Sequence, residues 1–355
     1  MSDAAAGSVA GSVVTRSPLA RSLDLLQQYG VLVAFVGLFA FNAIWQGDAF
    51  LKPENLRNLL NQNAAVGIVA VGMTLVIVAG GIDLSVGAVM ALAAAVGMLA
   101  MNGLAGMVDA EGAGQFVPLL AGFASAIGVG LACGALNGGL VTLGRIPAFI
   151  ATLAGLIGFR SITLALAEGG EIRADQAITA VQAIGRDGLA IPGVVNAYDK
   201  PVVFYWTILV FLAVVVIGQL TLSRTRRGRH LVAVGSNELA ARYSGVPVAR
   251  VKLWSYTIVG FCAALGGIAS TVRMNSVSSS QLGLYAELDA IAAVVIGGTS
   301  MTGGRGRVWG TLLGVLILVM ITNMLSLWQV EVYWQGFVKG VIIVLAVLIQ
   351  RGRAS

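Results

Sequence analysis

Charged residues are the scarcest class in this 355-residue chain. Only 11% of its residues are Asp, Glu, Lys or Arg, whereas 57% are hydrophobic. A water-soluble domain usually carries about 25% charged residues, so this sequence has too little charge to cover an ordinary soluble surface. The composition therefore predicts a protein that lies in a lipid bilayer.

Residues that build metal and nucleotide sites are also scarce. His230 is the single histidine, and Cys133 and Cys262 lie in separate apolar stretches that suit small buried residues better than a disulfide or a metal ligand. The chain contains no Gly-Lys dipeptide, which the phosphate-binding loop of nucleotide hydrolases requires. We therefore expect no enzyme activity, no cofactor and no metal, and any ATP that drives this protein must bind to another chain.

Long hydrophobic runs, in contrast, are abundant. Only helices and closed barrels satisfy backbone hydrogen bonds in lipid, and these runs lack the alternation of barrel strands. Hydrocarbon about 30 Å thick needs about 20 residues per helical crossing. About ten runs approach this size, at residues 29–45, 63–79, 84–101, 116–143, 146–166, 202–222, 253–272, 287–299, 308–327 and 334–350. The predicted fold class is therefore an all-α polytopic membrane protein, in which 287–299 is short enough and 116–143 long enough to form a re-entrant or broken helix.

Basic residues accumulate on one side of the predicted spans. With the N-terminus inside, most of the 22 Lys and Arg residues fall in inner segments, while the outer loops are richer in acidic residues. Because cytoplasmic loops collect positive charge, both termini are predicted to be cytoplasmic. We interpret 1–28 as a cytoplasmic lead, 29–350 as one transmembrane domain and 351–355 as a cytoplasmic tail. The net charge of +6 then reflects orientation in the bilayer and not binding to nucleic acid.

The segment 223–252 is the most informative soluble stretch. Ser236 or Asn237 can cap a short helix that Gly245 ends and Pro247 prevents from continuing. An isolated helix of this length is unstable in water, which leaves two interpretations. The helix packs against the ends of its own spans, or it docks into a cytoplasmic partner through the apolar patch that Leu239 and Tyr243 form at a spacing of four.

Several motifs occur in a fixed order along the chain. Residues 80–87 read GGIDLSVG, Asn137-Gly138 follow, 145–153 read RIPAFIATL, and 285–300 read YAELDAIAAVVIGGTS. In this order they resemble the membrane permeases of ATP-binding-cassette sugar importers, the ribose, xylose and arabinose permease family, from about the second span to the C-terminus.

The resemblance implies a type II importer-like permease in a bacterial plasma membrane, multi-pass and homodimeric. It implies a cytoplasmic ATP-binding-cassette ATPase that binds the two copies and an extracytoplasmic sugar-binding protein that delivers a monosaccharide, with a pentose such as ribose as the first choice. It also implies that the short helix in 223–252 is the coupling helix that fits the ATPase, which favours docking; its residues are Glu238, Leu239, Ala240, Ala241, Tyr243 and Gly245. Another small polar cargo, such as a branched-chain amino acid or a nucleoside, and a stand-alone secondary transporter remain alternatives.

A neutral, hydroxyl-rich cargo needs a path of amides, hydroxyls and aromatic faces. The candidate path residues are polar side chains within predicted spans: Asn63, Asp83, Ser85, Asn137, Thr152, Asp289 and Asn323. A charge at membrane depth costs roughly 2.5–3.5 kcal/mol on insertion scales, so both carboxylates need partners, and Arg160 is a candidate. Asp83 either faces the path or caps a helix that starts at Leu84; the chain break at Gly80 and Gly81 favours the cap.

A shift of 223 residues places Gly80 and Gly81 on Gly303 and Gly304. Transporters are often built from inverted repeats, but the predicted topology gives these two segments the same direction. We therefore interpret the match as compositional.

Overall fold

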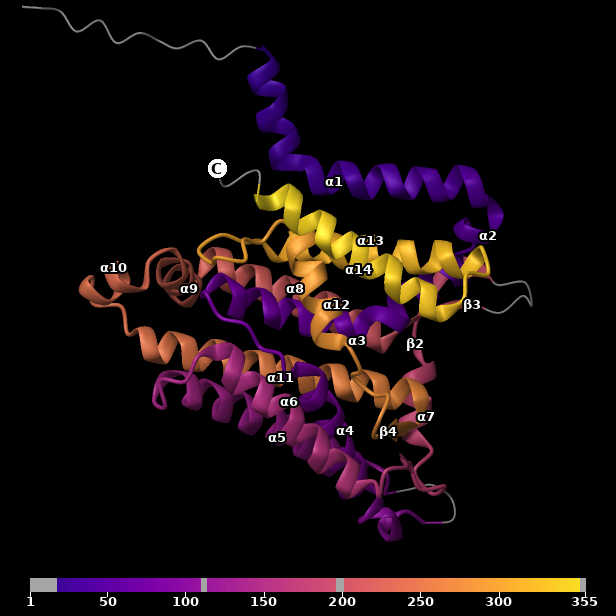
Figure 1. The fold of residues 1–355 in the computed structure, drawn as a ribbon. Coiled ribbons are helices and arrows are strands. Elements are labelled where there is room, and N and C mark those ends of the chain that lie inside the picture. Colours follow the sequence, from indigo (N-terminus) through magenta and orange to yellow (C-terminus); the bar gives the residue numbers. More distant parts are fainter. Residues whose placement is uncertain (1–17, 110–113, 196–200, 352–355) are drawn as a thin grey trace, which may run out of the picture.

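The computed structural model describes residues 18–109, 114–195 and 201–351, which are mostly helical (Figure 1). The helices are α1 (Pro18–Gln46), α2 (Asp48–Leu51), α3 (Pro53–Val78), α4 (Val86–Asn102), α5 (Phe116–Thr142), α6 (Ala148–Leu166), α7 (Ala180–Arg186), α8 (Trp206–Arg224), α9 (Arg226–Ser236), α10 (Glu238–Tyr243), α11 (Val248–Met274), α12 (Ala286–Ile296), α13 (Val308–Leu327) and α14 (Val332–Arg351), with a 3-10 turn at Ala105–Met107. Four short strands accompany them: β1 (Glu171–Arg173), β2 (Gly188–Val195), β3 (Pro201–Tyr205) and β4 (Ser276–Ser278).

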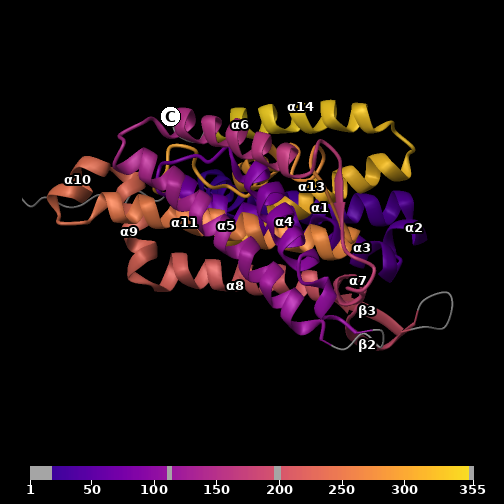
Figure 2. The same cartoon turned by 90° about the horizontal axis from the view of Figure 1, so that it is seen from below.

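The long helices run between two ends of the molecule. In Figure 1, α9 and α10 lie at one end, which we call the α10 end, and α7 with the strands lies at the other, which we call the β end. Figure 2 shows α8 along one side of the bundle and α14 along the opposite side, with α11, α5 and α4 between them.

Seven helices among the described residues are long and apolar enough to cross a membrane, namely residues Tyr29–Gln46 of α1 together with α3, α5, α6, α8, α11 and α13. The polytopic helical character predicted from the sequence is therefore confirmed. α5 runs unbroken through 27 residues, so the break considered within 116–143 is wrong. α12 has only 11 residues, which at 1.5 Å per residue covers about half of the hydrocarbon thickness, as the short run predicted.

Several predicted helix boundaries were displaced by proline and by strand pairing. α3 begins at Pro53, well before residue 63, because proline is favoured in the first helical turn. α8 begins at Trp206, since residues 202–205, which were assigned to the span, belong to β3. α1 begins at Pro18, within the predicted lead, although the membrane-crossing part still starts at Tyr29.

The description of the fold as all-α needs a correction at the β end. β1 pairs antiparallel with β4, and β2 pairs antiparallel with β3. The Val-Val-Phe-Tyr run of β3 is rich in β-branched and aromatic residues, which favour strands. These pairs lie outside the long apolar helices.

The core of the bundle is formed around α3 and α11. In the most apolar stretch of 18 residues, 78% of the residues of α3 and 67% of those of α11 are buried, compared with 6% in α1. α11 packs closely on α5 because small residues face each other. A Cβ added to Gly134 of α5 would lie 2.4 Å from the carbonyl oxygen of Tyr256. The glycine in α5 therefore serves close helix packing.

Two chain breaks meet at the α10 end. The turn after α3 contains Gly80 with φ +78°, and the turn after α12 contains Gly303 with φ +86°. Gly235 of α9 fills the space between them: a Cβ there would lie 1.9 Å from the carbonyl oxygen of Val78 and 2.6 Å from the amide nitrogen of Gly304. The amide of Gly304 donates to Val78 over 2.9 Å, so the backbones of three segments are in direct contact here.

Candidate functional site

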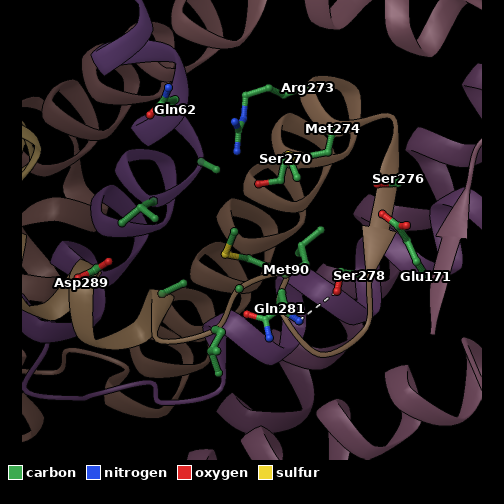
Figure 3. A pocket seen from close by; sticks show the side chains of 16 residues that line it. Gln62, Met90, Glu171, Ser270, Arg273, Met274, Ser276, Ser278, Gln281 and Asp289 are labelled. Carbon is green, nitrogen blue, oxygen red and sulfur yellow. Dashed lines mark hydrogen bonds between the residues drawn. The ribbon is translucent and has the colours of Figure 1, made fainter. Parts of the chain in front are cut away.

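A cavity of about 250 Å³ opens at the β end between α3, α4, α11, the β1–β4 pair and the start of α12. We call it the β-end cavity. Its polar lining consists of Gln62, Glu171, Ser270, Arg273, Ser276, Ser278, Gln281 and Asp289. Figure 3 shows Arg273 reaching into the open space from the end of α11, with Gln62 on one side and Glu171 and Ser276 on the other. Hydroxyls, amides and a few charges thus surround one space.

The strand pair fixes one wall of this cavity. Glu171 lies opposite Ser278 in the β1–β4 register. A hydrogen bond from the Ser276 hydroxyl and, to a smaller extent, one from Arg173 lower the pKa of Glu171 below its usual value. Ser278 accepts a hydrogen bond from the amide of Gln281 over 3.3 Å, which shapes the turn after β4. An ionised carboxylate and an ordered turn therefore border the opening.

Arg160 of α6 binds the connection between β4 and α12, which lines part of the β-end cavity. Its Nη1 donates to the carbonyl oxygens of Ser279 and Leu282 at 2.9 and 2.8 Å, and its Nη2 approaches that of Gly87 at 3.4 Å. Gly283 presses against Gly87, where a Cβ would lie 2.1 Å from the carbonyl oxygen. One guanidinium thus ties α6, α4 and the β4–α12 connection together. The expected pairing of Arg160 with Asp83 or Asp289 is wrong, because its N–H groups are used by main-chain carbonyls.

Asp289 of α12 instead pairs with Lys339 of α14, with 3.3 Å between Nζ and Oδ2. Both side chains are about 30% exposed or less. Asp289 lines the β-end cavity and also borders a smaller cavity of about 20 Å³ that Asn63 and Lys339 share. The carboxylate therefore stands at the wall between the two spaces.

Asp83, Ser85 and Asn137 form a buried cluster near the α10 end. Asp83 Oδ1 accepts hydrogen bonds from the amide of Ser85 at 2.8 Å and from its hydroxyl at 2.7 Å, and Asn137 Nδ2 donates to the same hydroxyl at 2.7 Å. All three residues are at most 1% exposed. The helix begins at Val86 with Ser85 in the cap position, so the predicted start at Leu84 and the cap at Asp83 are wrong. Asp83 instead closes the turn that precedes the helix.

The other predicted path residues are held by local bonds. Thr152 Oγ1 donates to the carbonyl of Ala148 at 2.8 Å, and Asn63 Nδ2 donates to that of Leu59 at 2.9 Å. Asn323 Nδ2 donates to Asn55 Oδ1 at 3.0 Å, which links α13 to α3. Of the seven predicted path residues, Asp289 is the one that lines the β-end cavity.

The short helix of the predicted coupling segment is present as α10. Asn237 caps it by accepting a hydrogen bond from the amide of Ala240 at 2.9 Å, and Gly245 follows it with φ +79°. Leu239 and Tyr243 are 61% and 83% exposed, whereas Ala241 is 5% exposed. The helix therefore packs on its own chain through Ala241 and presents an apolar surface outward through Leu239 and Tyr243.

Sequence reasoning missed most of the β-end cavity. Arg273 at the end of α11 lies just outside the predicted apolar run, and Gln281 and the serines of β4 lie in the connection between α11 and α12. A usable signal was the concentration of serine and glutamine in residues 276–281, which read SVSSSQ beside the motif that begins at Tyr285. Gln62 lies in the polar run 61–63 beside the predicted path residue Asn63, whereas Glu171 carried no such signal, and only the tertiary structure brings the two to the same space.

Comparisons with known proteins agree on one family. A family model described as "Branched-chain amino acid transport system / permease component" matches residues 55–347. The chain is 40% identical over 326 residues to the ribose import permease protein RbsC of Bacillus subtilis (strain 168), covering 90% of this chain and 92% of that protein. It is 40% identical over 320 residues to RbsC of Escherichia coli (strain K12), covering 90% of each. It is 33% identical over 374 residues to the xylose transport system permease protein XylH of the same strain, covering 92% of each. No solved structure matches the chain.

Proposed function

This chain belongs to the family of permease components of branched-chain amino acid transport systems, and on that premise we propose that it is the permease subunit of an ATP-driven monosaccharide importer. The cargo is a pentose such as ribose, because the relatives at 40% identity are named ribose import permeases. The chain itself carries no ATP-binding motif, so a separate ATPase supplies the energy.

The β-end cavity is the observation that carries this proposal. Its volume of about 250 Å³ lies near the lower limit of ligand pockets, which is about 300 Å³, and therefore suits a small cargo. Serine hydroxyls and glutamine amides both donate and accept hydrogen bonds, as the hydroxyl groups of a neutral sugar require. Arg273 can form bidentate hydrogen bonds with adjacent hydroxyl groups.

The topology follows from the same premise. In this proposal the chain crosses a bacterial plasma membrane about ten times as one domain over 29–350, with both termini, 1–28 and 351–355, on the cytoplasmic side. The α10 end is then cytoplasmic and the β end faces outward. The basic segment 223–252 lies at the α10 end, which supports this orientation through the positive-inside rule.

The partners are an ATPase at the α10 end, an extracytoplasmic sugar-binding protein at the β end and a second copy of the chain. Support for ATPase docking comes from the exposed Leu239 and Tyr243 on α10. Coupling through residues 238–245 then requires the ATPase to move α10. Because α10 follows α9 directly, this movement would reach Gly235 of α9, which contacts the turns after α3 and α12. The predicted path residues between the two ends, Asn63, Asp83, Ser85, Asn137, Thr152, Asp289 and Asn323, are proposed to line or stabilise this route.

Reconstitution in liposomes with the ATPase and the binding protein tests the function. We expect ATP-dependent uptake of labelled ribose or xylose and none of leucine or a nucleoside. Gln281→Ala should lower uptake, whereas Ser280→Ala should not, because Ser280 neighbours the cavity without lining it. Uptake of leucine in place of the pentoses would assign the other cargo class, and uptake driven by an ion gradient without the ATPase would overturn the importer.

A further inference from the structure

Another cavity lies at the α10 end, far from the β-end cavity along the bundle. It has a volume of about 270 Å³ and is lined by Arg227 and His230 of α9 and by Pro247, Arg250, Val251 and Trp254 around the start of α11. We call it the α9–α11 cavity. Four of its six lining residues, Arg227, His230, Arg250 and Trp254, have side-chain N–H groups that donate hydrogen bonds, and none is acidic. Its lining is therefore suited to an anion.

The positive charge at this cavity is not neutralised by the surrounding described residues. Segment 223–252 contains one acidic residue, Glu238, whose carboxylate is already paired with Arg242 at 3.5 Å and Lys252 at 2.6 Å. Within the described part of the chain, no carboxylate forms an ion pair with Arg227 or Arg250. Two guanidinium groups therefore meet at one cavity without a counter-charge.

Trp254 holds one of these groups in place. The guanidinium carbon of Arg227 lies 5.2 Å from the centroid of the Trp254 ring, a cation–π contact. A guanidinium stacked on an aromatic face still presents its N–H groups at the edge, and this planar fork matches the oxygens of a phosphate. The side chain that would contact a phosphate is thus positioned before the ligand arrives.

The location of the cavity indicates which phosphate reaches it. α9 is amphipathic: it buries Gly228, Leu231 and Val234, while Arg226, Arg227 and Arg229 are exposed. Because Leu231 and Val234 pack in the core of the bundle, the arginines of α9 face outward where the membrane-crossing helix α8 ends and α11 begins. This places the cavity at the boundary between hydrocarbon and water, where tryptophan is enriched. Lipid phosphates lie at that level too. We propose that the α9–α11 cavity binds the phosphate group of an anionic phospholipid in the leaflet at the α10 end.

Native mass spectrometry of the full-length chain, released from nanodiscs of phosphatidylcholine and phosphatidylglycerol, tests the site. The double variant Arg227→Gln, Arg250→Gln should retain phosphatidylglycerol roughly 30-fold more weakly, from about five- to sixfold per basic residue. The matched control is Arg226→Gln, Arg229→Gln, which removes the same charge from exposed positions outside the cavity. The control should retain the lipid nearly as the unmodified chain does.

Quenching of tryptophan fluorescence by brominated phosphatidylglycerol adds a measurement of direct contact. The part of the quenching that disappears in Trp254→Phe comes from Trp254, which lines the cavity. Equal lipid loss in both double variants would overturn the proposal in favour of diffuse attraction to the bilayer. Displacement of the lipid by millimolar inorganic phosphate, with no preference for phosphatidylglycerol over phosphatidylcholine, would assign free phosphate as the ligand. Unchanged lipid retention with weakened ATPase binding in phosphatidylcholine nanodiscs would assign the cavity to the partner protein and also overturn the proposal.

Discussion

Lys339 of α14 and Asp289 of α12 form an ion pair over 3.3 Å at the wall of the β-end cavity, and both groups are largely withdrawn from the surface. Lys339→Met would leave the Asp289 carboxylate unpaired. We expect a loss of about 1–3 kcal/mol in the free energy of unfolding, the usual cost of removing a partner from a charged hydrogen bond.

Thermal unfolding in detergent measures this loss, and the double variant Lys339→Met, Asp289→Asn provides the control. Because the double variant leaves no unpaired charge, it should recover part of the lost stability. If the effects of the two single variants simply add, the pair has no coupling energy and the prediction is wrong.

Arg160→Lys should lower uptake by about tenfold, because one ammonium cannot reach three carbonyl groups as the planar guanidinium does. The carbonyls of Ser279 and Leu282 would lose their shared donor, and the β4–α12 connection should become more sensitive to proteolysis. Arg186→Lys at the end of α7 serves as the control, since Arg186 is exposed. Equal uptake by both variants would show that the contact to the carbonyls is dispensable.

Asp83→Asn should be mild, with less than about 1 kcal/mol lost, because the amide oxygen can still accept the two hydrogen bonds from Ser85. Asp83→Ala removes the acceptor and should cost about 1–3 kcal/mol. Unfolding in detergent and uptake in liposomes are measured on the same preparations. A complete loss of uptake in Asp83→Asn with normal assembly would instead place the carboxylate in the translocation path.

Gly235→Ala should impair assembly strongly. Its Cβ would lie 1.9 Å from the carbonyl oxygen of Val78, and overpacking of this kind costs about 1–3 kcal/mol or more. Gly139→Ala is the matched control: it also lies in a helix, but its Cβ would meet nothing within 4 Å, so the variant should be neutral or stabilising. Comparable yields and melting temperatures for both variants would contradict the close contact.

Tyr243→Ala and Leu239→Ala should disconnect ATP hydrolysis from uptake without changing stability by more than about 0.5 kcal/mol, because both side chains are exposed. The ratio of sugar transported to ATP hydrolysed is the measurement. Met301→Ala, in the connection between α12 and α13, is the control for exposed apolar residues. Ala241→Trp is a poorer test, since Ala241 is buried and a large side chain would disturb the packing of α10. Unaltered coupling in both alanine variants would refute docking through this patch.

The sequence alone determined the features that depend on neighbouring residues. Continuous apolar runs predicted the membrane-crossing helices because lipid leaves the backbone few alternatives to a helix. A cap at Ser236 or Asn237 and an end at Gly245 were predicted because capping and left-handed turns involve residues a few positions apart, and Asn237 is the residue that caps α10.

The tertiary structure alone decided which polar groups meet. Arg160 was expected to pair with Asp83 or Asp289, but its Nη1 donates to main-chain carbonyls, which every residue has and no side-chain pattern reveals. β1 and β4 lie about a hundred positions apart, and their pairing brings Glu171 to the cavity that Gln62 and Arg273 share. Such contacts depend on how α3, α11 and α12 pack against one another. Hydrophobic periodicity places a helix in the membrane, but it does not specify which neighbour each polar side chain will face.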